Sequence, residues 1–183
     1  MTCQIIRSNR KSFGLEVNRD GLIIHAPIQA TDEEINSFIL QHKKWIENNL
    51  NKVEERQKAE SEIVPLTMDE VQKLADKALK VIPSRVKYYA SKVGVTYGRI
   101  TIRNQRSKWG SCSSKGNLNF NCLLMLTPDE VIDSVVVHEL CHRKEMNHSE
   151  RFYDEVLRVF PDYWKWDQWL KENGDLLMKR MVK

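Results

Sequence analysis

The stretch "VIDSVVVHELCHRKEMNH", residues 131–148, holds three of the five histidines of the 183-residue chain. Its apolar residues fall on nearly every side of a helix, which predicts that the helix is buried. His138 and His142 are four residues apart, so their side chains lie one helical turn apart, with about 5–6 Å between Cβ atoms. Two imidazoles at this spacing can bind one cation, and Glu139 lies close enough to act as a general base toward a metal-bound water. The H-E-x-x-H pattern therefore predicts a metal-dependent hydrolytic site.

The competing interpretation is a buried helix whose histidines have only a structural role. Unpaired polar groups at the end of a buried helix are costly, and a cation would satisfy them. His148 follows His142 by six residues, enough for the chain to leave the helix, turn near Asn147 and supply a third imidazole. Three protein ligands with an open position are typical of a catalytic zinc site. We therefore expect His138, His142 and His148 to bind Zn²⁺, with nickel, cobalt or manganese as alternatives. Metzincins have a glycine three residues after the second histidine, where this chain has Glu145, so we expect a different turn.

The N-terminal part of the chain predicts a β-hairpin followed by one long helix. Within residues 4–28, "SFGLEVN" (12–18) alternates apolar and polar residues, and "RDG" supplies a turn to a second strand. Thr31 and Glu34 form a capping box, and apolar residues at helical spacing predict a helix from about residue 32 into the 50s. Because the chain is almost wholly polar from there to residue 62, we expect two domains, residues 1–62 and 63–183.

The rest of the chain predicts helices interleaved with short strands. Two capping residues, Thr67 and Thr127, are expected to begin helices, the second of which carries the histidines. Pro83 is expected to break the first of these helices in two. In two further segments, apolar and polar residues alternate in a way that predicts strands, and the segment between them is predicted to be a loop. The expected strands are residues 95–104 and 116–126, the loop is 105–115, and further helices are expected after Ser149 and in the tail from Asp162.

Composition and the N-terminal sequence limit the class of protein and the compartment in which it is expected. A hydrophobic content of 41% and a charged content of 30% are ordinary for a globular protein and exclude wholesale disorder. The sequence shows no signal-peptide pattern and no apolar run of membrane-spanning length, so we expect a cytoplasmic protein with no membrane partner. The four cysteines show no paired spacing, which favours reduced thiols. The net charge of +4 would suit an anionic partner but does not require one.

Two segments resemble the YgjP-like metallopeptidase family: "RSKWGSCSSKGNLNFN" (106–121) and "VIDSVVVHELCHRKEMNHSERFY" (131–153). The N-terminal hairpin and "KKWIENNL" (43–50) are also similar to that family. The resemblance implies an α+β fold related to SprT-like and M48-type proteases. In this minimal zincin-like domain the active-site helix packs on a small antiparallel sheet, and an N-terminal β-hairpin and long helix precede it. It also implies that His138, His142 and His148 are the metal ligands and that Glu139 is the general base.

The first functional hypothesis is a zinc metallopeptidase that acts on polypeptides. In zincins a strand beside the active-site helix binds an extended peptide at the sheet edge. Residues 116–121, with Asn119, are the candidate for this strand, and an ordinary sheet strand is the alternative. Trp109 is expected to line the cleft. The nearer candidate donors to an oxyanion are Tyr153, Tyr163 and Arg151.

The second hypothesis is a metal-dependent nucleoside triphosphate pyrophosphohydrolase that uses the same metal site. Arg106 and Lys108, with Arg103, precede the histidine motif and would bind phosphates. Such an enzyme would gather these side chains in one cleft facing the histidines, whereas a peptidase would not need to. Association with nucleic acid is a third possibility, supported only by the mild positive charge and by no recognised motif.

Overall fold

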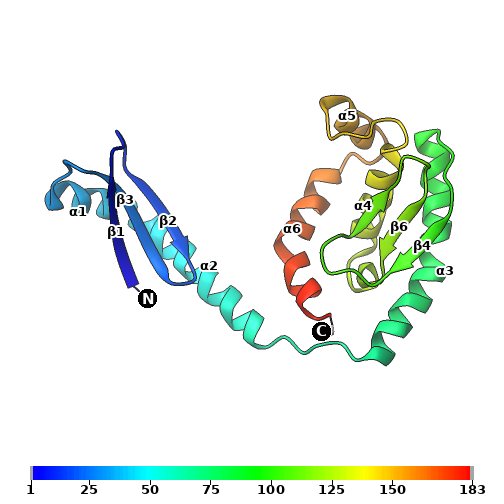
Figure 1. Cartoon of the computed structure of the whole chain (residues 1–183), viewed down its shortest axis with the longest axis horizontal. Coiled ribbons are helices and arrows are strands. Elements are labelled where there is room, and N and C mark those ends of the chain that lie inside the picture. The colour runs from blue at the N-terminus through cyan, green and yellow to red at the C-terminus, as the bar shows by residue number, and fades with distance from the viewer. Residues whose placement is uncertain (1, 182–183) are drawn as a thin grey trace. The chain divides into compact units, whose positions relative to one another are not determined.

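The computed structural model describes residues 2–181 (Figure 1). In its N-terminal part, the turn between Asn18 and Gly21 connects the two strands of the predicted hairpin. Oδ1 of Asn18 accepts hydrogen bonds from the N–H groups of Asp20 and Gly21 at 2.9 and 3.2 Å. Gly21 has a φ of 136°, and a Cβ there would lie 2.0 Å from the carbonyl oxygen of Thr2, so only glycine fits. The hairpin consists of β2 (Gly14–Asn18) and β3 (Gly21–Pro27).

A third strand, β1 (Thr2–Ser8), joins this hairpin and was not expected as a separate strand. It pairs in parallel with β3, which gives the order β1-β3-β2. Every residue of β1 is exposed, so its sequence carries no buried face that periodicity would detect. The predicted hairpin is thus part of a mixed three-stranded sheet.

The long helix predicted after the hairpin is wrong, because two helices occupy that segment. They are α1 (Asp32–Gln41) and α2 (Lys43–Ser61), with His42 between them. Nδ1–H of His42 donates to the carbonyl of Phe38 at 2.9 Å and so bonds the last turn of α1. The sheet and the two helices share a small core, which includes Leu22, Ile24, Ala26, Ala30, Ile35 and Ile46. Contacts divide the chain into this unit, Met1–Ile63, and a second unit, Val64–Lys183.

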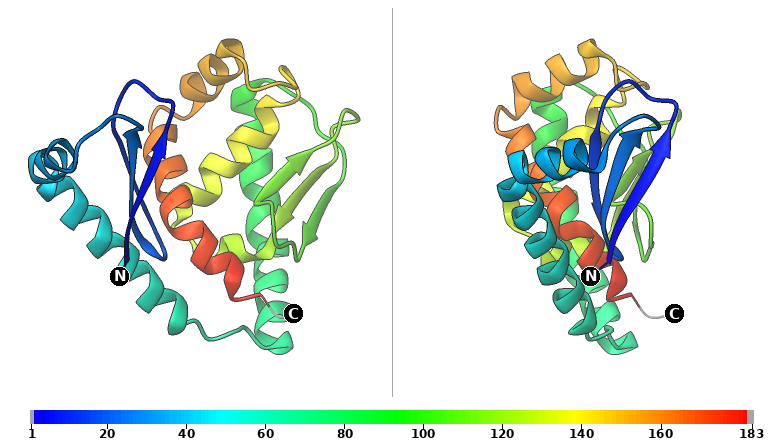
Figure 2. Two further views of the ribbon diagram at one scale, coloured as in Figure 1. Left: turned by 60° about the vertical axis from the view of Figure 1, so that its left-hand side comes forward. Right: turned by 90° about the vertical axis from the view of Figure 1, so that its left-hand side faces the viewer.

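The second unit is built around α4 (Asp129–Cys141), the helix that carries the histidine motif. Three helices pack against it: α3 (Met68–Val93), α5 (Glu150–Val159) and α6 (Tyr163–Lys179). A three-stranded sheet lies on its remaining side, with β5 next to α4 (Figure 2). Enclosure on all sides explains why α4 is apolar around its circumference. The α+β fold class expected from the sequence is therefore confirmed.

The sheet of the second unit is mixed rather than antiparallel. Its strands are β4 (Ile100–Arg103), β5 (Gly110–Cys112) and β6 (Leu118–Asn121), in the order β4-β6-β5. β4 runs parallel to β6 and β5 antiparallel to it. β5 lies in the segment expected to be a loop, and the expected second strand ends at Asn121, where the 3₁₀ helix η1 (Cys122–Leu126) begins. The side chain of Asn121 caps η1 by accepting a hydrogen bond from the Leu123 N–H, which competes with further strand.

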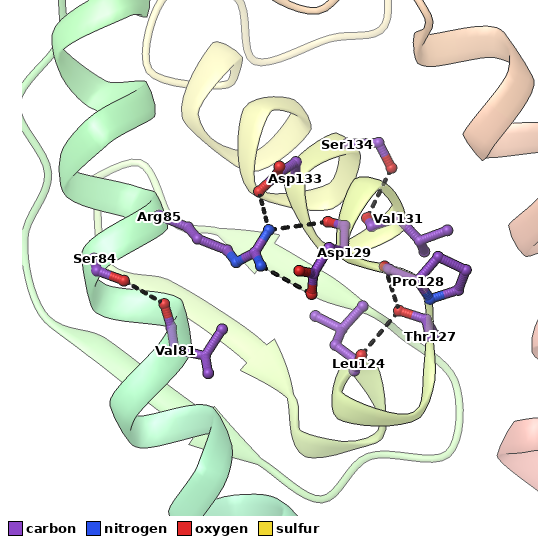
Figure 3. A network of polar contacts seen from close by, with 10 residues as sticks. All are labelled: Val81, Ser84, Arg85, Leu124, Thr127, Pro128, Asp129, Val131, Asp133 and Ser134. Atoms are coloured by element: carbon purple, nitrogen blue, oxygen red, sulfur yellow. Dashed lines mark hydrogen bonds and ion pairs between the residues drawn. The ribbon is translucent and has the colours of Figure 1, made fainter.

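Pro83 does not break the first helix of this unit, contrary to the prediction, because α3 runs through it. Buried residues on both sides of Pro83, including Ile82 and Val86, anchor the helix in the core. Arg85 adds ion pairs to Asp129 at 2.9 Å and Asp133 at 2.6 Å on α4 (Figure 3). These contacts offset the loss of one backbone hydrogen bond at proline.

The boundaries of the remaining helices agree with the sequence except at one cap. Thr67 begins α3 with the expected capping box, Ser149 precedes α5, and the tail forms α6. Thr127 does not cap α4, since its hydroxyl donates to the carbonyl of Leu124 in η1 at 2.8 Å and Pro128 takes the N-cap position. Among residues 2–181, no helix combines the length and the apolar character needed to cross a membrane.

Candidate metal centre and catalytic cleft

α4 holds two imidazoles one turn apart at its C-terminal end. The ring centroids of His138 and His142 lie 4.9 Å apart. His142 is the C-cap residue, and its N–H donates to the carbonyl of His138 at 3.4 Å. Its side chain stays close to the core, because the residue is only 9% exposed. The backbone of a buried helix therefore sets the geometry of this pair.

His148 reaches the same point from the turn after α4. The N–H groups of Lys144 and Glu145 both bond to the carbonyl of Cys141, at 2.9 and 3.0 Å, which closes the turn. Nε2 of His148, an exposed residue, then lies 3.0 Å from Nε2 of His138. One possible ligand atom from each of the three histidines lies within 4.8 Å of the others. Two nitrogens bound to one tetrahedral zinc at 2.0–2.1 Å would be about 3.3 Å apart, so this convergence is of the right size for a metal.

Phe152, in the first turn of α5, contacts all three imidazoles. Its ring centroid lies 4.9, 4.6 and 4.9 Å from those of His138, His142 and His148, and it is fully buried. A phenyl ring offers the imidazole nitrogens no conventional hydrogen bond. It fixes the positions of the three rings by packing and leaves their nitrogens to other partners.

The Nδ1 atoms of the two helical histidines have such partners. Nδ1–H of His142 donates to the carbonyl of Glu145 at 3.1 Å. Since a carbonyl only accepts, the proton of His142 is on Nδ1 and the lone pair of Nε2 is available to a metal. Nδ1 of His138 lies 2.9 Å from the hydroxyl of Tyr163 on α6. Contacts of this kind orient metal ligands and raise their basicity.

Burial keeps these imidazoles uncharged. It lowers the pKa of His138 to about 3, with smaller contributions from His142 and His148, and it also lowers the pKa of His142. Both imidazoles are therefore neutral near pH 7, which is the form that binds metals. Three imidazole donors fit zinc or another divalent transition metal, whereas calcium and magnesium prefer oxygen ligands.

Glu139 lies beside this centre as a buried carboxyl group. It is 6% exposed, and burial raises its pKa to about 8, against an opposing effect of the Lys108 ammonium. Gly110 in β5 makes room for it, because a Cβ at residue 110 would lie 2.6 Å from Oε1 of Glu139. A carboxyl group whose pKa lies near neutrality can both take up and release a proton.

A cavity of about 230 Å³ opens from Glu139 and His138. Its three walls are the loop that enters β5, one side of α4 and one side of α6. The residues lining it are Ser107, Lys108, Trp109, Gly110, Ser134, Val135, His138, Glu139, Tyr163, Asp167 and Leu170. The structure thus places Trp109 and Lys108 beside the proposed catalytic groups.

Asn121 holds the loop that carries Lys108 and Trp109, a role that the sequence did not reveal. Its Nδ2 donates to the carbonyls of Gln105 and Lys108 at 2.6 and 3.0 Å, and its backbone N–H donates to Trp109. The residue is 1% exposed. An asparagine at the end of a short strand carries no local signal for such long-range bonds.

The expectation that residues 116–121 form a peptide-binding edge is wrong. β6 pairs with β4 on one side and with β5 on the other, so neither of its edges is free. Nδ2 of Asn119 donates to Oγ of Ser111 on β5 at 3.1 Å, a cross-strand contact within the sheet. Asn119 is thus engaged in the sheet itself.

The free edge beside α4 belongs to β5. The backbone groups of Trp109 and Ser113 are bonded toward β6, and an antiparallel ladder alternates, so those of Gly110 and Cys112 point to the other edge. Within residues 2–181, no strand pairs with that edge. A strand with free hydrogen-bonding groups therefore begins next to Glu139.

The basic residues considered for phosphate binding are dispersed. Lys108 lines the cavity, but Arg106 does not, and Arg103 lines a separate groove between β4 and α3. Of the candidate oxyanion donors, Tyr163 lines the cavity and Tyr153 stacks on His148 with centroids 6.2 Å apart. Arg151 is exposed on α5.

Three imidazoles converging beside a buried carboxyl group define the site of a metal-dependent hydrolase. The sequence agrees, because the family model for "YgjP-like, metallopeptidase domain" matches residues 11–71 and 68–173. The chain therefore belongs to the YgjP-like metallopeptidase family, which confirms the resemblance noted in the sequence. No curated protein matches the chain.

Among solved structures, two metallopeptidase zymogens are similar to part of the chain. Jannalysin of Methanocaldococcus jannaschii aligns with a TM-score of 0.46 at 20% identity, over 51% of this chain and 96% of its own. Abylysin of Pyrococcus abyssi aligns with a TM-score of 0.47 at 22% identity, over 56% of this chain and 100% of its own.

Proposed function

We propose that this metal-dependent hydrolase is a zinc peptidase in which His138, His142 and His148 hold the metal and Glu139 is the general base. The observation that carries the proposal is the convergence of the three imidazoles within 4.8 Å of one another, directly beside a carboxyl group that is 6% exposed. A purely structural role for the histidines would not require three rings that converge on one point next to a buried acid.

Each residue of the site has a separate role in the proposed hydrolysis. A zinc ion bound by three imidazoles would polarise the scissile carbonyl and lower the pKa of water at its open position. Glu139 accepts the proton of the attacking water on a carboxylate oxygen and then delivers it to the leaving amine nitrogen. Tyr163 and Glu145 keep the helical imidazoles in orientation through Nδ1. Tyr163 also lines the cavity, which makes its hydroxyl a candidate donor to the developing oxyanion.

The free edge of β5 supports a polypeptide as substrate. An extended peptide can add to that edge through the outward backbone groups of Gly110 and Cys112. Gly110 contacts Glu139, so a peptide bound along β5 passes the general base. Main-chain binding of this kind requires an unfolded segment and tolerates many side chains.

The test compares the zinc-loaded chain with its Glu139→Gln variant on an unfolded polypeptide. The variant should keep its zinc, measured by elemental analysis, and lose hydrolysis by several orders of magnitude, measured by mass spectrometry of the products. Ser111→Ala, on the same strand but away from the metal, is the matched control and should keep most of the activity. Turnover by the Glu139→Gln variant at the normal rate would refute the role of the base.

A nucleoside triphosphate pyrophosphohydrolase is the second candidate, and Lys108 in the cavity lining is the observation that favours it. The other cations of the expected set lie outside that lining, so the support is narrower than for a peptidase. Substituting Arg106 and Lys108 together by alanine should spare peptide cleavage and abolish pyrophosphate release from nucleoside triphosphates. Adding DNA to the same assays tests the nucleic-acid association suggested by the net charge.

A further inference from the structure

We infer that the free edge of β4, together with the groove between β4 and α3, is a docking site for an acidic, extended segment of a partner polypeptide. The site lies at the opposite edge of the sheet from β5, and no residue of the groove lines the catalytic cavity. The inference therefore goes beyond the proposed peptidase function and does not depend on it.

β4 has one hydrogen-bonding edge without a partner strand. Within the described residues, 2–181, β4 pairs with β6 alone, and it is the strand nearest to α3 (Figure 1). The Leu118 N–H of β6 donates to the carbonyl of Arg99 at 2.9 Å. Because the direction of the backbone groups alternates along a strand, the N–H and C=O groups of Ile100 and Ile102 point to the free edge.

A groove of about 450 Å³ lies between this edge and α3. Leu79 of α3 is 57% exposed there, and Ala75 lies one helical turn before it. Ile100 and Ile102 pack against the core of the second unit and form the other wall. One exposed leucine is ordinary by itself, but beside a free strand edge it gives an added strand apolar surface to cover. Every second side chain of such a strand would enter the groove and bury that surface.

Two cations flank the edge on the outer face of the sheet. Arg99 and Arg103 are exposed, stand two residues on either side of Thr101, and lie on the face opposite to the side chains of Ile100 and Ile102. Within the part of the chain that the structure describes, neither guanidinium has a hydrogen bond or an ion pair, and the groove lining contains no acidic residue. Opposite charges directly across two strands attract. An added strand is therefore favoured by acidic residues at two positions four residues apart.

These contacts define a pattern of five residues in the partner. Acidic residues at the first and fifth positions face Arg103 and Arg99, apolar residues at the second and fourth enter the groove, and the middle residue faces Thr101. Antiparallel addition is the more stable pairing, and it places the backbone groups of the two apolar residues opposite those of Ile102 and Ile100. In strand addition the main-chain hydrogen bonds supply affinity and the alternate side chains supply specificity.

The same arginines disfavour a second copy of this chain at the edge. In an antiparallel pair of two β4 strands centred on Thr101, Arg99 of each copy would lie opposite Arg103 of the other. Like charges directly opposite each other are destabilising, and charged side chains commonly protect sheet edges from self-pairing. The arginines therefore repel the chain's own β4 and attract an acidic strand, which is how a surface discriminates between partners.

The groove also favours a polypeptide over a nucleic acid. Phosphates would contact the two arginines, but they would leave the apolar walls and the outward N–H and C=O groups of Ile100 and Ile102 without partners. An extended peptide engages the cations, the apolar walls and the backbone edge together.

The test measures binding by fluorescence anisotropy on the zinc-loaded full chain carrying Glu139→Gln, so that the probe is not consumed. The probe is a fluorescein-labelled peptide with the expected pattern, Ser-Glu-Val-Thr-Ile-Glu-Ser. Exchanging both glutamates for lysine, or both apolar residues for serine, should weaken binding at least about tenfold. Binding of the probe should also weaken as the salt concentration rises. No binding of the probe, or equal binding of the three peptides, would overturn the inference.

Charge reversal locates the peptide on β4 rather than β5. The double variant Arg99→Glu, Arg103→Glu should bind the acidic probe at least about tenfold more weakly and should bind the lysine peptide in its place. The double variant Lys87→Glu, Lys115→Glu reverses two exposed charges of the same unit outside the groove and should bind as the parent chain does. If the first variant does not fold, Arg99→Gln and Arg103→Gln repeat the test singly. An unchanged preference for the acidic probe, or the same change in both double variants, would contradict the assignment.

Backbone methylation of the peptide tests strand addition itself. In the antiparallel arrangement the amide nitrogens of the valine and the isoleucine donate to β4, and that of the threonine points to solvent. Methylating the first two nitrogens should abolish binding, and methylating the threonine nitrogen should leave it unchanged. An equal effect of the two modifications, or the opposite ranking, would rule out this arrangement.

Two further measurements on the same chain test the other occupants. Sedimentation should show no dimer that the probe dissociates, and a single-stranded DNA oligonucleotide should not displace the probe. A dimer that the probe dissociates would assign the edge to a second copy of the chain, and displacement by DNA would assign it to a nucleic acid. Either result would overturn the inference. All these readouts are of binding, so failure of the peptidase function would leave them unchanged.

Discussion

A Cβ atom on Gly110 would lie 2.6 Å from Oε1 of Glu139, so a glycine in β5 provides the space that the carboxyl group of α4 occupies. The two residues are far apart in the sequence and meet because β5 packs on α4. The same contact brings the free edge of β5 next to Glu139. The position of the Glu139 carboxyl group and its closeness to the β5 edge therefore depend on one glycine.

Gly110→Ala should lower kcat by about 100-fold, since a displacement of about 1 Å in a catalytic group has an effect of that order. The three atoms nearest to a Cβ at residue 110 all belong to Glu139, so zinc content should be unchanged. Steady-state kinetics and elemental analysis on the same preparation give both quantities. Ser111→Ala is the matched control. Full activity in Gly110→Ala would show that the contact with Glu139 is dispensable.

His148→Ala should lower zinc affinity by orders of magnitude, because only two imidazoles would remain. Glu155 is a carboxylate on the neighbouring helix α5, but it is bonded to Lys144 and Arg158, each at 2.5 Å, and lies outside the histidine cluster. Glu155→Gln should therefore bind zinc as tightly as the unmodified chain. Competition with a chromophoric chelator measures the zinc affinity of both variants. Weaker zinc binding by Glu155→Gln than by His148→Ala would make Glu155 the third ligand in place of His148.

Tyr163→Phe removes the hydroxyl that lies 2.9 Å from Nδ1 of His138. Loss of such an outer partner typically costs 10–100-fold in metal affinity or activity, and we expect a loss in that range. Tyr153→Phe, a nearby ring that stacks on His148, is the control and should change neither quantity. Equal behaviour of the two variants would exclude a role for the Tyr163 hydroxyl.

The pH dependence of stability should report the ion pairs of Glu155. Its pKa is lowered to about 2, first by the hydrogen bond from Arg158 and then by Lys144. A carboxyl group with a lowered pKa stabilises the folded chain above its unfolded pKa, and this contribution is lost as the pH falls through the folded value. Glu155→Gln should therefore be less stable than the unmodified chain at pH 6–7. Thermal melts should show the difference shrinking between about pH 4.5 and 2, and a constant difference would contradict this account.

Local spacing accounts for the parts of the structure that were predicted correctly. The capping boxes at Thr31 and Thr67 involve residues three apart and form as expected. His138 and His142 meet because one helical turn separates them, whatever surrounds the helix. The turn that brings His148 back to the helix is also short. The spacing therefore predicted that His148 can reach the other two histidines, but not the path of the turn.

Predictions that depended on pairing between distant segments were less successful. β6 has the alternation of a strand, yet alternation does not distinguish a central strand from an edge strand, so the edge expected at residues 116–121 was wrong. β5 is only three residues long and was expected to be a loop. Pro83 was expected to end a helix that core packing and Arg85 hold together.

The sequence by itself predicted the α+β class from its periodicity and its resemblance to a family. It also predicted that His138, His142, His148 and Glu139 lie together, because these four residues are close in the sequence, within one helix and one turn. Only the tertiary structure decided that β5 supplies the free edge, that Gly110 makes room for Glu139 and that Tyr163 contacts His138. It also decided that Trp109, Val135 and Leu170 enclose one cavity. Each of these relationships joins segments separated by at least one other element. They arise from the burial of α4 between the sheet and α6, a packing that no local periodicity encodes.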